Sequence, residues 1–333
     1  MSNSKTSYPS TSLEDCSSVI LSGELAVLPT ETVYGLCALA CDPLAISKIF
    51  KLKGRPSSNP LIAHILNLSW LNAISEPSPV AFKLGEFFWP GPLTIVLPKK
   101  NLIPLNLSAG LPTVAIRSPA HHAFRKVLEL VNQPIAAPSA NLSNRVSPTT
   151  MEHVIQNFGK HCPPIYDGGP CEHGLESTVL DLSERHPCIL RPGPISLPEI
   201  ENALGMKILD QPIKHSLDKI SQKSPGNSKI HYAPQTPVRL FKSLTHMIDQ
   251  QETMINQVVL LPSLEKSNEF TVHGITTLLL SKDGNPRSIA KNLYHVLQKA
   301  DQLGKEKMNI CLLSGTEALI PAINDRLVRA SNK

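Results

Sequence analysis

Short apolar runs, many of them bounded by proline, alternate along the first two thirds of the chain with segments of helical periodicity. The runs contain β-branched residues and are too short for helices, which is typical of buried strands. Proline at their ends fixes φ and removes a backbone donor, so it ends a strand or begins a turn. We therefore predict strands over residues 25–28, 93–97, 113–116, 134–137, 177–182 and 188–190.

Helix signals fall between several of these runs. Asp42 before Pro43 is a typical N-cap followed by the first helical residue, a stripe of apolar residues follows at helical spacing, and Gly54 ends the helix. Thr149 and Glu152 have the spacing of a capping box. They predict a second helix that ends near Gly159.

The pattern divides the chain into three parts. Mixed strands and helices predict an α/β or α+β domain over residues 10–204. Residues 205–236 have little apolar periodicity and several prolines, which indicates a linker, and linkers of this length are usually functional or disordered. Residues 237–333 alternate strands with helices, which predicts a small parallel α/β domain. Its strands are expected near residues 238–241, 257–261, 275–280 and 309–313, and its best-marked helix over residues 285–304.

Composition narrows the class of protein. The chain has 333 residues, of which 41 % are apolar and 18 % charged, so a charge-rich disordered protein is excluded. No apolar run approaches the roughly 20 residues that span a membrane, and no signal or transit sequence is visible at the start. The seven cysteines include no C-x-x-C, which favours reduced thiols. We expect a cytoplasmic protein with no membrane partner.

The formal charge of +5 is unevenly distributed. Residues 1–210 are near neutral, whereas residues 211–333 have an excess of lysine and arginine. This excess is a weak indication of an acidic partner, and a solvated basic surface explains it as well.

Several common sites are excluded by residue spacing. The chain has no H-E-x-x-H, and Cys162, Cys171 and His173 lack the spacing of a tetrahedral metal site. A P-loop would need lysine after Gly174, where the chain has Leu175. The G-x-S-x-G motif of α/β-hydrolases is absent as well.

Polar clusters remain, and each lies where a predicted strand or helix ends. Cations and hydroxyls at such ends are what a polyphosphate and a small zwitterion need, because Arg and Lys supply charge-assisted hydrogen bonds and hydroxyls fix orientation. A helix N-terminus near residues 147–149 would add free backbone N–H groups. The clusters are PTETVYGL from residue 29, Lys53 to His64, TVAIR from residue 113, PSAN from residue 138, Glu176-Ser-Thr, Arg191-Pro-Gly and His231-Tyr232.

Each cluster also has a purely structural interpretation. Basic residues at a helix end offset the helix dipole, hydroxyls and amides form turns, and a histidine in an apolar run usually belongs to the core. In this interpretation Lys53 and Arg55 close a helix, Ser139 and Asn141 form a turn, His64 is a core residue, Thr30 and Thr32 cap a strand, Arg117 and Arg191 are surface arginines, and His231 and Tyr232 are linker residues.

The motifs occur in an order that resembles one family. PTETVYGL, K-x-R-P-x-x-N-P-L-x-x-H, TVAIR, PSAN, GLESTV, RPG and a linker with SPG and HYAP resemble the two-domain threonylcarbamoyl-AMP synthases of the YrdC type over nearly the whole chain. The resemblance implies an α/β fold with a YrdC-like twisted open sheet and a small Rossmann-like C-terminal domain. It implies synthesis of L-threonylcarbamoyladenylate and pyrophosphate from L-threonine, ATP and bicarbonate or CO2. The product would pass to the tRNA threonylcarbamoyltransferase complex, with no stable tRNA binding required.

The resemblance also implies roles for individual residues. Lys53 and Arg55 would be the catalytic cations, at an exposed helix end, and Mg²⁺ would arrive with ATP. Residues 227–230 of the linker depart from the family pattern. L-threonine or its N-carboxy form would be held by Thr32, His64, Arg117, Ala137 and Ser177. ATP would be held by Lys53, Arg55, Asn59, Thr113, Ser139, Asn141, Ser147 and Arg191, with His231 and Tyr232 closing over it.

Two other functions are compatible with a YrdC-like domain. One is RNA binding without adenylate synthesis, which the near-neutral first domain and the 5 % aromatic content disfavour. The other is carbamoyl transfer to a protein or an antibiotic, which is disfavoured because the acylphosphatase and zinc-finger modules that accompany it are missing. In the preferred function a carbamate oxygen attacks the α-phosphorus of ATP, so positioning and fixed cations should dominate catalysis.

Overall fold

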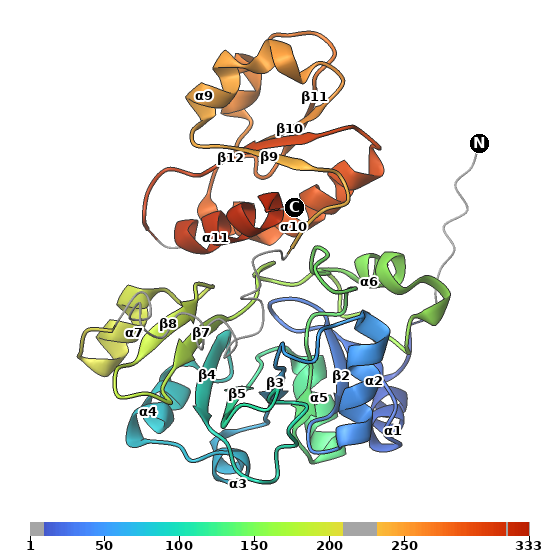
Figure 1. The fold of residues 1–333 in the computed structure, drawn as a ribbon, viewed down its shortest axis with the longest axis vertical. Helices are drawn as coiled ribbons and strands as arrows, with labels where there is room; N and C mark the ends of the chain where they lie inside the picture. Colours follow the sequence, from blue (N-terminus) through green and yellow to red (C-terminus); the bar gives the residue numbers. More distant parts are fainter. Residues whose placement is uncertain (1–9, 209–231, 318, 333) are drawn as a thin grey trace.

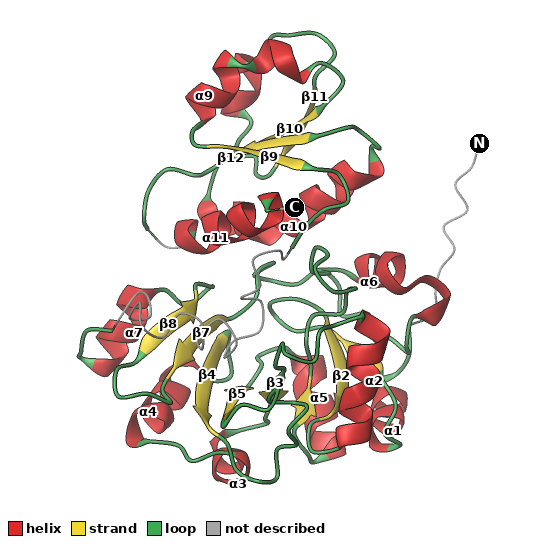
Figure 2. Ribbon diagram, viewed as in Figure 1, coloured by secondary structure: helices red, strands yellow, loops and turns green. Residues whose placement is uncertain are grey.

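The computed structural model describes residues 10–208, 232–317 and 319–332, which form two units that each combine helices and strands (Figures 1 and 2). The first unit contains an eight-stranded sheet in the order β1-β2-β6-β3-β5-β4-β7-β8. The pairs β3–β5 and β4–β7 are parallel and the other pairs are antiparallel, so the sheet is mixed and open. The strands are β1 (Ala26–Leu28), β2 (Gly35–Leu39), β3 (Ile62–His64), β4 (Leu93–Pro98), β5 (Thr113–Arg117), β6 (Ile135–Ala136), β7 (Thr178–Asp181) and β8 (Cys188–Arg191).

Two of these strands were not among the predicted strands: β2 begins in the PTETVYGL cluster and extends beyond it, and β3 ends the cluster from Lys53 to His64. The predicted helix after Asp42 is confirmed, because its carboxylate Oδ1 accepts hydrogen bonds from the N–H groups of Leu44 and Ala45, and Gly54 ends the helix at φ 59°. The helices of the first unit are α1 (Leu13–Leu21), α2 (Pro43–Lys53), α3 (Leu71–Ile74), α4 (Pro79–Phe88), α5 (His122–Val131), α6 (Met151–Phe158) and α7 (Leu197–Leu204), with 3-10 turns at Leu68–Trp70 and Gly159–His161.

The predicted capping box of α6 is wrong by one residue. Thr150 is the N-cap, and its hydroxyl accepts from the backbone N–H of His153. Thr149 is buried, with its Oγ1 3.3 Å from the Nδ1 of His153, so its hydroxyl is engaged with the imidazole ring. The end of the helix at Gly159 is as predicted.

Strand alternation places polar residues on one face of the first sheet. Side chains two residues apart on a strand share a face. This face bears His64 of β3, Thr94 of β4 and Arg117 of β5, next to a small apolar cluster that includes Ile62 and Val96. The open face of the sheet therefore carries the side chains from which a polar site can form.

The second unit is the predicted small parallel α/β domain. Its sheet has the order β11-β10-β12-β9, and every pair is parallel. Helices α10 and α11 lie between this sheet and the first unit, and α9 covers the other side (Figure 1). Its elements are β9 (Val238–Phe241), α9 (Leu244–Asp249), β10 (Val258–Leu261), β11 (Thr276–Leu279), α10 (Pro286–Gln302), β12 (Met308–Cys311) and α11 (Ile320–Ser331), with 3-10 turns at Gln251–Met254 and Glu265–Glu269.

Candidate functional site

A pocket opens on the polar face of the first sheet, where the loops after β1 and β6 meet the loop before β7 and the end of β8. It brings together predicted site residues from most of the polar clusters. Residues from each half of the sheet contribute, and Tyr232 reaches in from the end of the linker. The pocket is lined by Thr30, Thr32, Val33, Gly35, Arg55, Ile62, His64, Arg117, Ala137, Pro138, Ser139, Glu176, Ser177, Arg191 and Tyr232.

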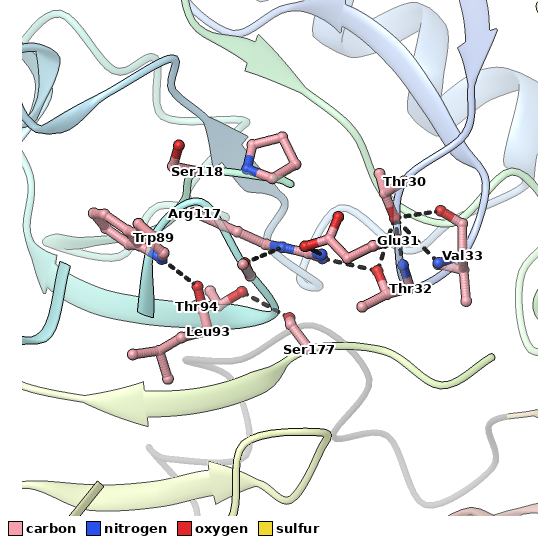
Figure 3. A network of polar contacts seen from close by, with 12 residues as sticks. Thr30, Glu31, Thr32, Val33, Trp89, Leu93, Thr94, Arg117, Ser118 and Ser177 are labelled. Carbon is pink, nitrogen blue, oxygen red and sulfur yellow. Dashed lines mark hydrogen bonds and ion pairs between the residues drawn. The ribbon is translucent and has the colours of Figure 1, made fainter. Parts of the chain in front are cut away.

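Arg117 anchors the side of the pocket that carries Thr32 (Figure 3). Its guanidinium forms a buried ion pair with Glu31 at 2.7 Å and donates to the Thr32 hydroxyl at 2.9 Å and to the Gly91 carbonyl at 3.2 Å. Burial opposes ionisation of Glu31, but the charge and hydrogen bond of Arg117 hold the pKa of this carboxyl below its usual value. Because Glu31 is ionised, it holds the Arg117 guanidinium in a fixed orientation.

Thr30 shapes the turn that presents Thr32. Its hydroxyl oxygen accepts hydrogen bonds from the backbone N–H groups of Thr32 and Val33, both at 3.1 Å, and lies 2.8 Å from the Thr32 hydroxyl. A threonine at this position closes such a turn because its hydroxyl can accept from the backbone two and three residues on.

The opposite side of the pocket is formed by Ser177 and Arg191. The Arg191 guanidinium donates through Nε and Nη2 to the Ser177 carbonyl, at 3.1 and 3.0 Å, and through Nη2 to the Ser177 hydroxyl at 3.1 Å. The Thr94 hydroxyl lies 2.7 Å from the Ser177 hydroxyl, and Thr94 itself is outside the pocket lining.

The pocket is electropositive. Arg55 donates to the carbonyls of Asn59 and Pro60, and burial lowers its pKa to about 10, so it stays protonated at neutral pH. Burial, reinforced by the charge of Arg117, lowers the pKa of His64 to about 3, so this imidazole is neutral. Guanidinium groups at three sides with interspersed hydroxyls suit an anionic, oxygen-rich ligand.

Lys53 does not lie where the sequence placed it. It was expected at an exposed helix end, but its side chain is only 2 % exposed and does not line the pocket. Its Nζ donates to the carbonyls of Ser139 and Asn141 at 2.6 and 2.5 Å, because the loop after β6 covers the end of α2. Burial, with the nearby charge of Arg55, lowers the pKa of the Lys53 ammonium well below its usual value.

Several other predicted residues lie behind the pocket wall. Asn141 donates to the carbonyls of Leu142 and Arg145, and Ser147 donates to Glu176 at 2.6 Å. Thr113 begins β5, and the Asn59 carbonyl accepts from Arg55. His231 and the linker residues 227–230 lie outside the described residues. Thr32, Arg55, His64, Arg117, Ala137, Ser139, Ser177, Arg191 and Tyr232 line the pocket; Lys53, Asn59, Thr113, Asn141 and Ser147 do not.

The second unit reaches the pocket through a network that sequence reasoning missed. Glu176 accepts hydrogen bonds from Tyr294 at 2.8 Å and from Arg326 at 3.1 Å. The Arg326 guanidinium also lies over the ring of Tyr232, 5.3 Å from its centroid. Tyr294 and Arg326 occupy ordinary positions in amphipathic helices, so no local signal distinguishes them.

The described part of the chain carries neither a cluster of metal-ligating side chains nor a helix that could span a membrane. No group of three or more histidine, cysteine, aspartate or glutamate residues could hold a metal ion within residues 10–208, 232–317 and 319–332. Among the helices of these residues, none is long and apolar enough to span a membrane.

Comparison with known proteins shows which proteins this chain is similar to. The family model described as Telomere recombination matches residues 18–193, and the one described as Threonylcarbamoyl-AMP synthase, C-terminal domain, matches residues 195–332. The threonylcarbamoyl-AMP synthase of Pyrococcus abyssi is 39 % identical, over 94 % of this chain and 92 % of the relative. That of Bacillus subtilis is 36 % identical, over 87 % and 84 %. The crystal structure of P. abyssi Sua5 complexed with L-threonine superposes with a TM-score of 0.84 at 35 % identity, covering 96 % of this chain and 94 % of that one.

Proposed function

This chain belongs to the threonylcarbamoyl-AMP synthase family, and from this we propose that the pocket on the open face of its first sheet is the active site. The chain is a nucleotidyltransferase that makes threonylcarbamoyl-AMP from L-threonine and ATP. One observation carries the location of the site. Arg55, Arg117 and Arg191 are buried and converge with hydroxyl groups on one pocket, which suits the union of an amino acid with a nucleotide.

L-threonine binds on the side formed by Thr32, Arg117 and Ser177. The guanidinium of Arg117, oriented by Glu31, pairs with a carboxylate of the amino acid. The Thr32 and Ser177 hydroxyls contact its remaining polar groups. The neutral ring of His64 and the Ala137 segment complete this subsite without adding charge.

ATP binds on the side that carries Arg55, Ser139 and Arg191. In this proposal Lys53, Asn141 and Ser147 contribute less by direct contact than by holding the pocket wall, because their polar atoms bond to the protein itself. We also propose that ATP is bound by Asn59, Thr113 and His231, the remaining residues that the family resemblance assigns to the nucleotide.

Mg²⁺ enters as part of the substrate MgATP. Two carboxylates adjoin the pocket, and each forms an ion pair with an arginine, Glu31 with Arg117 and Glu176 with Arg326. Their negative charge is therefore already balanced by arginine, which disfavours a protein-bound metal ion. The triphosphate therefore supplies the oxygen ligands that Mg²⁺ prefers.

The reaction joins two anions and needs no covalent link to the protein. The amine of L-threonine adds to CO2, supplied as bicarbonate or CO2, and loses a proton to give a carbamate. A carbamate oxygen then attacks the α-phosphorus, the bond from this phosphorus to the β-phosphate oxygen breaks, and pyrophosphate leaves. Arg55 and Arg191 offset the charge that builds on the phosphoryl oxygens, and their fixed positions supply most of the catalysis.

Tyr232 links the active site to the linker. Its side chain is fully buried in the pocket wall, stacks on Tyr294 at 5.6 Å between ring centroids and lies beside Arg326. We infer that the end of the linker that carries Tyr232 opens to admit substrates and closes to exclude water from the labile carbamate. The product then passes to the enzyme complex that transfers the threonylcarbamoyl group to tRNA.

The test is pyrophosphate release from ATP with each amino acid in turn, with the adenylate identified by mass spectrometry. The proposal expects release only with L-threonine and bicarbonate together, and protection of residues 205–236 from limited proteolysis by ATP with threonine. An RNA-binding module would retain RNA and release no pyrophosphate, and that outcome would overturn the assignment.

A further inference from the structure

Two buried hydroxyl groups, those of Ser177 in the pocket wall and Thr94 on strand β4, are hydrogen-bonded to each other. Thr94 lies on β4 and Ser177 directly precedes β7, the parallel neighbour of β4. Their hydroxyl oxygens are 2.7 Å apart, close to the usual length of an O–H···O hydrogen bond (Figure 3). Ser177 lines the pocket and Thr94 does not.

Geometry alone leaves the direction of this hydrogen bond open, but the surroundings decide it. Thr94 is 0 % exposed, and Ser177 is the one partner of its hydroxyl among the residues that the structure describes. If Ser177 were the donor, the Thr94 proton would be buried without an acceptor, which proteins avoid. Thr94 is therefore the donor and the Ser177 oxygen is the acceptor.

The second lone pair of Ser177 is used as well. Arg191 Nη2 donates to the same oxygen at 3.1 Å, and a guanidinium can only donate. A serine hydroxyl has two lone pairs and one proton, so only the proton of Ser177 remains for a ligand. Because Ser177 lines the pocket, the acceptor for this proton has to come from the pocket.

We propose that Thr94 is a positioning residue that makes Ser177 a dedicated hydrogen-bond donor to an oxygen atom of the bound amino acid. The inference rests on the proposed function, since it takes the occupant of this side to be L-threonine or its carbamate. An ammonium group has only donors, so the amine of the substrate points away from Ser177 and one of its oxygens points toward it.

The Thr94–Ser177 pair differs in this respect from the hydroxyl pair of Thr30 and Thr32. At the other hydroxyl pair, Thr30 also lies 2.7 Å from the Val33 carbonyl, so its proton has a second acceptor. The direction of the bond between Thr30 and Thr32 is therefore not determined in the same way.

The test is a double-mutant cycle on the full chain with Thr94→Val and Ser177→Ala, read as the dissociation constant of L-threonine by calorimetry. Removing the hydroxyl of Thr94 is expected to weaken binding about 3- to 10-fold, the loss that one hydrogen bond accounts for. In the Ser177→Ala background the same change should have no further effect, because Thr94 acts only through Ser177. Thr94→Ser keeps the hydroxyl and should restore binding to within about twofold.

A matched control removes another buried hydroxyl that does not face the pocket. Ser75 is 0 % exposed and donates to the Leu71 carbonyl, so Ser75→Ala should lower the thermal midpoint and leave threonine affinity unchanged. Thermal midpoints of all variants report folding, and Thr94→Ala replaces Thr94→Val if the valine does not fold.

The outcomes separate this inference from the proposed function. Unchanged affinity in Thr94→Val, or effects that add in the double variant, would overturn the role of Thr94. Coupled effects on threonine binding in a chain that releases no pyrophosphate would support the role of Thr94 and overturn the synthase activity. A wild-type chain that does not bind L-threonine would overturn both.

Discussion

Replacing Lys53 by methionine separates two possible roles of this residue. Lys53→Met keeps most of the length of the side chain but removes the donors to the carbonyls of Ser139 and Asn141. Each hydrogen bond from a charged donor contributes about 1.5–3 kcal/mol. Methionine also avoids the desolvation cost of the buried ammonium, which offsets part of this loss. The net destabilisation is about 2–4 kcal/mol. For a domain of this size we expect the thermal midpoint to fall by about 5–15 °C.

Lys51→Met is the matched control, because Lys51 lies in the same last turn of α2 but is exposed. It loses only an interaction with the helix dipole, about 0.3–1 kcal/mol. Calorimetric thermal midpoints and pyrophosphate release should be measured on the same samples. If Lys53→Met and Lys51→Met have equal thermal midpoints and only Lys53→Met loses pyrophosphate release, then Lys53 acts on the substrate and the structural role derived from its burial is wrong.

Three further predictions follow from the pocket and the contact between the units. Valine should give almost no pyrophosphate, because it leaves polar groups of the pocket unpaired, whereas serine should lose about 10- to 200-fold in kcat/KM; equal turnover of valine and threonine would contradict the assignment. Arg326→Met should destabilise the folded chain by about 3–5 kcal/mol, since it removes the buried guanidinium that pairs with Glu176; an unchanged denaturation midpoint would show that the ion pair contributes nothing. Burial, and to a lesser extent the charge of His295, lowers the pKa of His153 to about 4. The contribution of His153 to stability is therefore complete above pH 6.5 and is lost, by up to about 3 kcal/mol, as the pH falls from 6.5 to 4. In His153→Asn the stability should vary less with pH over this interval, and an unaltered profile would exclude His153 as its source.

Local sequence was sufficient for most of the fold. The helix over residues 43–53 and the helix after Asn285 carry caps and apolar stripes that need only neighbouring residues, and both are confirmed. Short apolar runs predicted the buried strands of both sheets. Strands β2 and β3 were missed because each overlaps a cluster of polar residues, whose pattern resembles a turn when it is considered alone.

Arg117 and His64 share a face because the parallel pairing of β3 with β5 places them opposite each other in register. Local sequence supplied both residues only through the motifs that contain them. It could not indicate burial, which depends on segments that are distant along the chain. Lys53 is covered by a loop 86 residues later, and Arg326 meets Glu176 across 150 residues.

The direction of the hydrogen bond at Ser177 belongs to the same class of property. Thr94 is 83 residues away in sequence and looks like an ordinary strand residue. Only the parallel pairing of β4 with β7 brings its hydroxyl to Ser177, and only the burial of Thr94 away from the pocket removes water as an alternative partner for its proton. Sequence determined which residue types were available to the site, because motifs are local. Tertiary structure decided which of them bond to one another and which face a ligand, because hydrogen bonding and desolvation depend on contacts between distant segments.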